Sequence, residues 1–135
     1  MDICIDFDGT CVTHEFPKVG KDIGAVPVLK ELLSNGHNLI LFTMRSDTDK
    51  QPFLADAVDW FKKNNIPLYG IQENPTQAEW TVSPKAYGQM YIDDAALGCP
   101  LIYPKDIAGI SSRRPYVNWQ TVRKILVHKG MIVNK

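Results

Sequence analysis

The segment Ile3-Cys4-Ile5-Asp6-Phe7-Asp8-Gly9-Thr10 decides the fold, because a short apolar run passes directly into acidic residues and a glycine. Such a run, bounded by turn residues, is typical of a buried strand. Asp6 and Asp8 are two residues apart, so along an extended strand their side chains would project to the same side. Two carboxylates that close repel each other, and the pKa of one should rise unless a cation joins them.

The rest of the chain alternates between apolar runs and helical patterns. Strands are expected over residues 1–7, 38–43, 67–71, 90–92 and 101–103. Apolar residues at helical spacing predict helices over 23–33, 49–63 and 119–128. We therefore expect an α/β fold: a Rossmann-like three-layer sandwich with a mostly parallel sheet of about five strands and helices on both faces.

Length and composition are those of one globular domain spanning residues 1–135. The 15 basic and 15 acidic side chains cancel, which disfavours nucleic acid as a partner. Three separated cysteines favour a reduced, cytoplasmic setting over a disulfide framework. No signal peptide precedes the first strand, and no apolar run approaches the ~20 residues of a membrane span, so no membrane partner is expected.

Polar residues stand at or just beyond the expected strand ends. They are Asp6 with Asp8, Thr43, Lys85, and Asp93 with Asp94. Because parallel strands bring their carboxyl ends to one edge of the sheet, where ligands bind in open α/β folds, these groups should converge. So many carboxylates require a cation, and Mg²⁺ binds a few carboxylates together with a substrate phosphate.

In this order, the residues resemble the four signature motifs of the haloacid-dehalogenase superfamily of phosphotransferases. The motifs are Asp6-Phe7-Asp8-Gly9-Thr10, Thr43 at the end of the second strand, Lys85, and the acidic pair of Tyr91-Ile92-Asp93-Asp94. Ala86 follows Lys85 where small bacterial members have a proline. Each motif alone has an ordinary explanation as a turn, a strand end or a helix cap; their order is what favours the family.

The resemblance implies a Mg²⁺-dependent phosphomonoesterase that works through an aspartyl-phosphate. Asp6 would attack phosphorus, and Asp8 would protonate the departing oxygen and then deprotonate the hydrolytic water. Lys85 would neutralise the nucleophile and the transferring group. The metal ligands would be Asp6, the Asp8 carbonyl and Asp94, while Asp93 would orient Lys85 or a metal-bound water; the reverse assignment of the last pair stays open.

Substrate contacts are expected from the loops after the strands. The candidates are Gly9, Thr10, Thr43, Met44, Arg45 and Lys85. His14, in the first loop, is a further candidate to face the site. Trp80 would either flank the site or pin its loop, and Arg113-Arg114 form either a phosphate patch or a solvated loop.

The spacing of the motifs leaves no room for a cap domain. Water exclusion would fall to residues 11–22, to residues 72–88, or to a neighbouring subunit of a homo-oligomer. Neutral net charge favours a small phosphorylated substrate such as a sugar phosphate or nucleotide. The alternatives are a phosphoacceptor signalling module and a phosphate-binding protein on the same fold without turnover.

Overall fold

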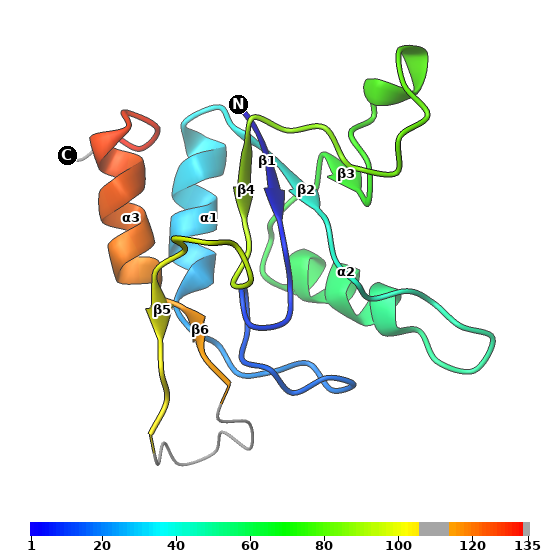
Figure 1. Cartoon of the computed structure of the whole chain (residues 1–135), viewed down its shortest axis with the longest axis horizontal. Coiled ribbons are helices and arrows are strands. Elements are labelled where there is room, and N and C mark those ends of the chain that lie inside the picture. The colour runs from blue at the N-terminus through cyan, green and yellow to red at the C-terminus, as the bar shows by residue number, and fades with distance from the viewer. Residues whose placement is uncertain (106–113, 134–135) are drawn as a thin grey trace.

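A four-stranded parallel sheet forms the centre of the computed structural model, which describes residues 1–105 and 114–133 (Figure 1). Its strands are β1 (Asp2–Ile5), β2 (Asn38–Leu41), β3 (Gly70–Ile71) and β4 (Met90–Ile92). They lie in the order β3-β2-β1-β4, and each neighbouring pair is parallel. The expected parallel α/β sheet is therefore confirmed, with fewer strands than expected.

Three α-helices accompany the sheet in the described part of the chain: α1 (Ala25–Ser34), α2 (Phe53–Lys63) and α3 (Trp119–His128). α3 begins at the expected residue because the Asn118 side chain accepts the backbone N–H of Thr121. α2 begins at Phe53 rather than Asp49, because a turn closed by the Thr48 N–H and the Gln51 carbonyl precedes it. No helix among these residues is long and apolar enough to cross a membrane.

The fifth expected strand does not join the sheet. Leu101–Ile102 forms β5, which pairs antiparallel with β6 (Tyr116–Val117) in a separate two-stranded unit. β6 is too short to show a period in the sequence, so β5 had no visible partner other than the main sheet. The prediction of about five strands in one sheet is wrong for this strand.

The three helices pack on one face of the sheet, which corrects the prediction of helices on both faces. One buried cluster joins strand residues Ile3, Ile5, Leu39 and Leu41 with Leu29 of α1, Phe61 of α2 and Leu126 of α3. Side chains alternate along a strand, so Cys4 and Ile40 point to the opposite face. There they form a second cluster with Ala86, against which Phe42 and Tyr91 pack. We call this second side the open face.

Chain direction explains why none of the α-helices in the described residues covers the open face. The connections β1–α1–β2 and β2–α2–β3 step the same way across the sheet, and right-handed crossovers put both helices on one side. The return from β3 to β4 passes over the other side. There the sequence supplies residues 72–88, which contain Pro75, Pro84 and only a three-residue helix, η1 (Gln77–Glu79).

Residues 72–88 are nevertheless firmly attached to the sheet. The Asn74 side chain donates to Asp2 Oδ2 over 2.9 Å and to the Tyr87 carbonyl over 3.1 Å. At Gly88, a Cβ atom would lie 2.8 Å from the Cys4 sulfur, so only glycine lets the backbone approach β1 this closely. This connection ends immediately before β4, the strand that delivers the acidic pair.

Candidate functional site

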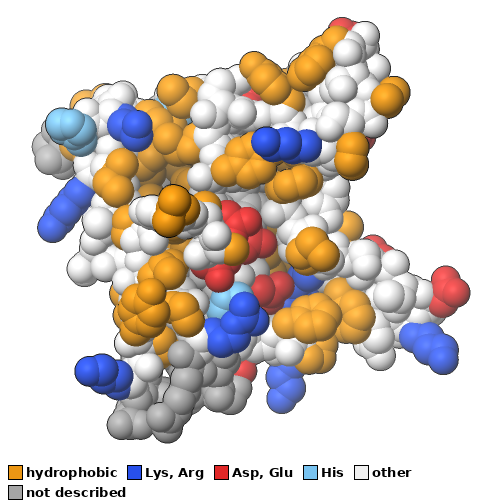
Figure 2. All heavy atoms as spheres, viewed as in Figure 1, with side chains coloured by type: hydrophobic (Ala, Val, Ile, Leu, Met, Phe, Trp, Pro, Cys, Tyr) orange, Lys and Arg blue, Asp and Glu red, His pale blue; other side chains and the backbone are white. Residues whose placement is uncertain are grey.

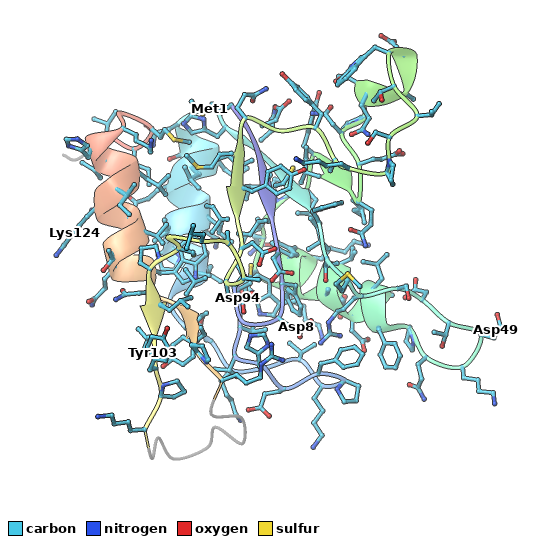
Figure 3. The ribbon with its side chains drawn as sticks, viewed as in Figure 1. Met1, Asp8, Asp49, Asp94, Tyr103 and Lys124 are labelled. Carbon is cyan, nitrogen blue, oxygen red and sulfur yellow. The ribbon has the colours of Figure 1, made fainter. Side chains whose placement is uncertain are left out.

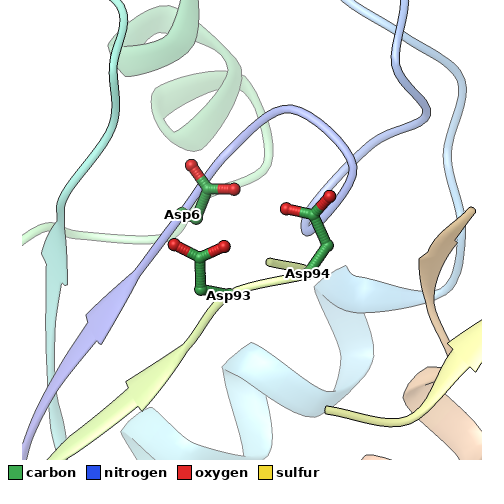
Figure 4. Close-up of side chains that lie close together, drawn as sticks. All are labelled: Asp6, Asp93 and Asp94. Atoms are coloured by element: carbon green, nitrogen blue, oxygen red, sulfur yellow. The ribbon is translucent and has the colours of Figure 1, made fainter. Parts of the chain in front are cut away.

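Asp6, Asp93 and Asp94 meet beyond the carboxyl ends of two neighbouring strands (Figure 4). Asp6 follows β1 and the acidic pair follows β4, with Ile5 opposite Ile92 in the register. Each carboxylate offers one oxygen, and these oxygens lie within 4.8 Å of one another. The structure thus brings together three of the carboxylates that the sequence placed at strand ends. We call this group the carboxylate cluster.

Two side chains from the first loop fix the cluster. The fully buried Thr10 places its hydroxyl 3.0 Å from Asp6 Oδ2 and 3.2 Å from Asp94 Oδ1, and accepts the Asp94 N–H over 3.0 Å. The single hydroxyl hydrogen can serve only one of the two carboxylates. His14 Nε2 lies 2.7 Å from Asp94 Oδ2. Thr10, expected to contact substrate, therefore holds Asp6 and Asp94 in place instead.

The loop that carries Thr10 is itself held from both sides. Gly9 has a φ of +79°, and a Cβ atom there would lie 1.9 Å from His14 Nε2, so glycine is needed for the histidine to reach Asp94. From α3, the Trp119 indole donates to the Thr10 carbonyl over 2.7 Å. Trp119 is buried and anchors this loop from the first turn of α3.

Burial, together with the neighbouring carboxylates, raises the pKa of Asp6 to about 8. Burial is the largest cause, followed by the hydrogen bond with Asp94 and the charge of Asp93. The pKa of Asp93 is also raised, first by burial and then by the charge of Asp94 and a hydrogen bond with it, although the Ala95 N–H lowers it. Three hard oxygen donors that repel one another suit a divalent cation such as Mg²⁺.

Asp8 lies outside the carboxylate cluster, and Figure 3 labels it together with Asp94 of the cluster. The partner of Asp8 is Arg45. Arg45 Nε donates to Asp8 Oδ2 and a terminal guanidinium nitrogen donates to Oδ1, both over 2.8 Å. Asp6, two residues before Asp8, lies instead with Asp93 and Asp94. The two carboxylates of this motif therefore have separate partners.

Arg45 is enclosed by its partners. Its remaining contacts run to the carbonyl of Phe53 over 3.1 Å and to that of Lys18 over 2.9 Å. The rings of Phe7 and Phe16 each lie 5.1 Å from the guanidinium carbon. Only 1% of the Arg45 side chain is exposed. The expected contact of Arg45 with a substrate anion does not fit this burial.

Thr43 follows β2 and is held by a residue that sequence reasoning missed. Gln72 accepts the Thr43 N–H over 2.9 Å and donates to the Thr43 carbonyl over 2.6 Å. The Thr43 hydroxyl accepts the Arg45 N–H over 3.1 Å. Gln72 follows β3, which the sequence predicted over residues 67–71, so only its place at a strand end could have indicated it. Met44 beside Thr43 is 97% exposed.

Lys85 does not meet the cluster. Its ammonium lies 5.6 Å from the centre of the Tyr91 ring, on the open face, and it forms no ion pair with the residues that the structure describes. Trp80 packs edge-on against Tyr87 at 5.2 Å and is 60% exposed, which favours the interpretation that it pins its own loop. Arg113 lies outside the described residues.

The cluster opens onto the face that the helices leave uncovered. By alternation along the strands, Asp6 shares the face of Cys4 and Asp93 shares the face of Tyr91. Phe42 and Tyr91 pack edge-on there at 5.8 Å. Figure 2 shows acidic side chains in the middle of this face, with hydrophobic side chains around them and basic ones above and below. A ligand on the open face would therefore meet carboxylates beside an aromatic surface.

Comparison with known proteins supports the fold. No protein-family model matches the chain, and no curated protein sequence matches it. A solved structure of a conserved protein coded by a locus from Bacteroides thetaiotaomicron is similar, with a TM-score of 0.73 and 27% sequence identity. The match covers 96% of this chain and 91% of that one, so it extends over nearly the complete fold.

Proposed function

We propose that this protein is a Mg²⁺-dependent phosphohydrolase whose nucleophile is Asp6. The observation that carries the proposal is the convergence of Asp6 with Asp93 and Asp94 at the carboxyl edge of the sheet. This arrangement agrees with the resemblance of the motifs to haloacid-dehalogenase phosphatases. The substrate would be a small phosphorylated metabolite, since the chain has no net charge and the site lies on an open face.

Mg²⁺ would be held by Asp6, Asp93 and Asp94, with the Asp8 carbonyl as the further ligand that the resemblance implies. The ion would supply positive charge that neutralises the transferring phosphoryl group. Asp6 Oδ attacks phosphorus, the bond to the leaving group breaks, and a phosphoaspartate forms. Proton transfer to or from the reacting groups falls to Asp8, which follows Asp6 by two residues and remains 18% exposed.

Two other groups have supporting roles. Thr43 N–H and carbonyl are occupied by Gln72, so its hydroxyl is the group left to meet a phosphate oxygen. Lys85 lies exposed over Tyr91, from where its flexible side chain can reach an anionic group on the open face. A second copy of the chain over this face, as the missing cap suggests, would exclude water from the site.

A phosphoacceptor module without turnover is the second candidate, and one observation favours it. Arg45 engages both oxygens of Asp8, the residue that hydrolysis of the phosphoaspartate requires. A restrained base would leave phosphorylated Asp6 long-lived, as signalling requires. The two candidates therefore share the first chemical step and differ in the second.

Turnover of p-nitrophenyl phosphate with Mg²⁺ tests the proposal, and acetyl phosphate labelling separates the candidates. We expect Mg²⁺-dependent release of phosphate by the natural chain and none by Asp6→Asn. Asp56→Asn, on the exposed side of α2, is the matched control and should be fully active. A stable label on Asp6 without phosphate release supports the phosphoacceptor instead. If neither label nor turnover is found with these substrates and a panel of sugar phosphates and nucleotides, both candidates fail.

A further inference from the structure

A cavity on the open face lies next to the carboxylate cluster. Its volume is about 400 Å³, within the usual range of small-molecule sites. Its walls come from residues 80–91 and include the rings of Trp80, Tyr87 and Tyr91. Tyr91 precedes Asp93 by two residues, so along the strand direction this wall lies about 7 Å from the cluster. We call this space the aromatic cavity.

The loop that presents Trp80 is organised around one buried side chain. Gln77, 3% exposed, accepts the backbone N–H groups of Asn74 and Tyr87 over 2.8 and 2.9 Å. Its amide nitrogen donates to two carbonyls of the same loop, each over 3.2 Å. These four hydrogen bonds are all that one side-chain amide can form. Trp80 is therefore carried on an ordered backbone, which reduces the entropy lost when a ligand binds to it.

Two aromatic side chains of the cavity are fixed and still accessible. Tyr87 packs edge-on against Trp80 at 5.2 Å, yet 60% of Trp80 remains exposed. The Tyr91 hydroxyl donates to the Ala86 carbonyl, and Phe42 packs edge-on against its ring at 5.8 Å. Rings held in this way offer surfaces on which a planar group can stack.

Two hydroxyl groups beside these rings can donate to a ligand. The Thr81 hydroxyl accepts the Ser83 N–H over 3.1 Å, and the Ser83 hydroxyl accepts the Lys85 N–H over 3.2 Å. Both hydroxyls line the aromatic cavity, and each keeps its own hydrogen for a further bond. The ring nitrogens and carbonyl oxygens at the edge of a nucleobase accept bonds of this kind.

We propose that the aromatic cavity binds the base of a nucleoside phosphate whose phosphate group lies at the carboxylate cluster, with Trp80 and Tyr91 as specificity-determining residues. This inference rests on the proposed phosphohydrolase function. The separation of Tyr91 from the cluster requires a spacer between phosphate and ring, which a pentose supplies and an aryl phosphate lacks. A simple sugar phosphate has no planar group for the cavity. Lys85, whose ammonium lies 5.6 Å from the centre of the Tyr91 ring, leaves this ring to the base when it turns to the phosphate.

Adenosine 5′-monophosphate and ribose 5-phosphate test the inference, because they share the phosphate, the sugar and the departing oxygen and differ in the base. With Mg²⁺ and the natural chain, we expect kcat/KM for the nucleotide to exceed that for the sugar phosphate by about 10-fold or more. Stacking of a base on an aromatic side chain contributes about 5- to 150-fold. Trp80→Ala should lower kcat/KM for the nucleotide by about 10-fold and bring the ratio close to one, whereas Trp80→Phe should keep part of it. Val82→Ala, at a fully exposed position of the same loop, is the matched control and should keep the natural ratio.

The other outcomes separate this inference from the proposed function. Equal kcat/KM for the two substrates, or an equal loss for both in Trp80→Ala, overturns the inference and leaves the phosphohydrolase standing. An equal loss together with a smaller sedimentation coefficient would assign Trp80 to contact with a second copy of the chain instead. If neither substrate is turned over, the proposed function fails, and calorimetric titration with adenosine tests the cavity by itself. Trp80→Ala should then weaken adenosine binding by about 10-fold relative to Val82→Ala. Equal binding by the two variants, or no binding by the natural chain, overturns the inference.

Discussion

Asp6 and Asp8 stand two residues apart in the same loop, yet their surroundings are opposite. Asp6 faces other carboxylates, and burial together with Asp94 and Asp93 raises its pKa to about 8. Asp8 faces a buried guanidinium that meets both of its oxygens at 2.8 Å. Asp6 therefore lacks a positively charged partner, whereas Asp8 has one that bonds to both of its oxygens.

The difference shows that the partners of a motif, rather than the motif, determine what each residue can do. The partners of Asp6 come from the end of β4, and the partner of Asp8 comes from the loop after β2. Asp6 is suited to bind a cation and then to attack phosphorus, whereas Asp8 is suited to a role that does not require metal. Each prediction that follows changes one side of this comparison.

The largest expected difference between Asp6 and Asp8 is in their contribution to Mg²⁺ binding. Asp6→Asn should weaken Mg²⁺ binding by more than about 100-fold, because even a residue behind the ligands contributes 10–100-fold. Asp8→Asn should leave the affinity nearly unchanged, because the side chain of Asp8 lies outside the cluster and only its carbonyl is assigned to the metal. Titration calorimetry with Mg²⁺ on both variants measures this, and equal losses would contradict the division of roles.

Breaking the Asp8–Arg45 pair should cost stability. Arg45→Met leaves Asp8 without its cation and should lower the free energy of unfolding by about 3 kcal/mol, as for buried pairs that lose one partner. The exposed pair Lys63–Asp59 on α2, at 3.0 Å, is the matched control. Lys63→Met should cost less than about 0.5 kcal/mol. Urea unfolding at neutral pH compares them, and similar losses would show that burial does not strengthen the first pair.

Stability without metal should fall as pH rises, because of Asp6. Its pKa in the folded chain is about 8, against an ordinary 3.8, so between these values the folded state binds more protons than the unfolded state. The stabilisation is complete below pH 4 and is lost progressively up to about pH 8. At about 1.4 kcal/mol per pH unit, the loss between pH 5.5 and 8 is on the order of 3 kcal/mol. Unfolding in EDTA at pH 5.5 and 8.5 measures it.

Two variants of that experiment locate the effect. Asp6→Asn should remove this part of the pH dependence, because the amide does not titrate. Saturating Mg²⁺ should reverse it, since the ion binds the ionised carboxylate and stabilises the folded state by mass action. An unchanged pH dependence in Asp6→Asn would place the titrating group elsewhere.

The strands and the acidic residues that follow them could be predicted from the sequence, because the residues that begin and end each element lie within that element or next to it. Thr10, expected to contact substrate, and Arg45, expected to meet an anion, were instead given other roles by the fold. Arg45 became buried because rings and carbonyls from residues 7, 16, 18 and 53 close around it. No local pattern encodes such contacts, since their partners lie in separate segments.

Which face of the sheet each helix covers could not be predicted from the sequence either. Helical periods over residues 23–33, 49–63 and 119–128 predicted the three helices α1, α2 and α3 within a residue or two, except at the start of α2. Which face each one covers depended on the direction of the crossovers, and on residues 72–88 forming an irregular connection. The open face is a consequence of the order of the strands and the direction of the crossovers. The apolar period of a single segment carries no information about either.

The smallest expected effect on Mg²⁺ binding is that of His14, because it acts on the cluster through Asp94. Its Nε2 lies 2.7 Å from Asp94 Oδ2, whereas the side-chain hydrogen bonds of Asp8 come from Arg45. His14→Ala should weaken Mg²⁺ binding by about 10-fold, the lower end for a residue that orients a metal ligand. His14→Gln, which keeps a donor, should recover part of this loss. His128, exposed at the end of α3, provides the control variant His128→Ala. If His14→Ala weakens Mg²⁺ binding no more than His128→Ala does, Thr10 alone orients Asp94.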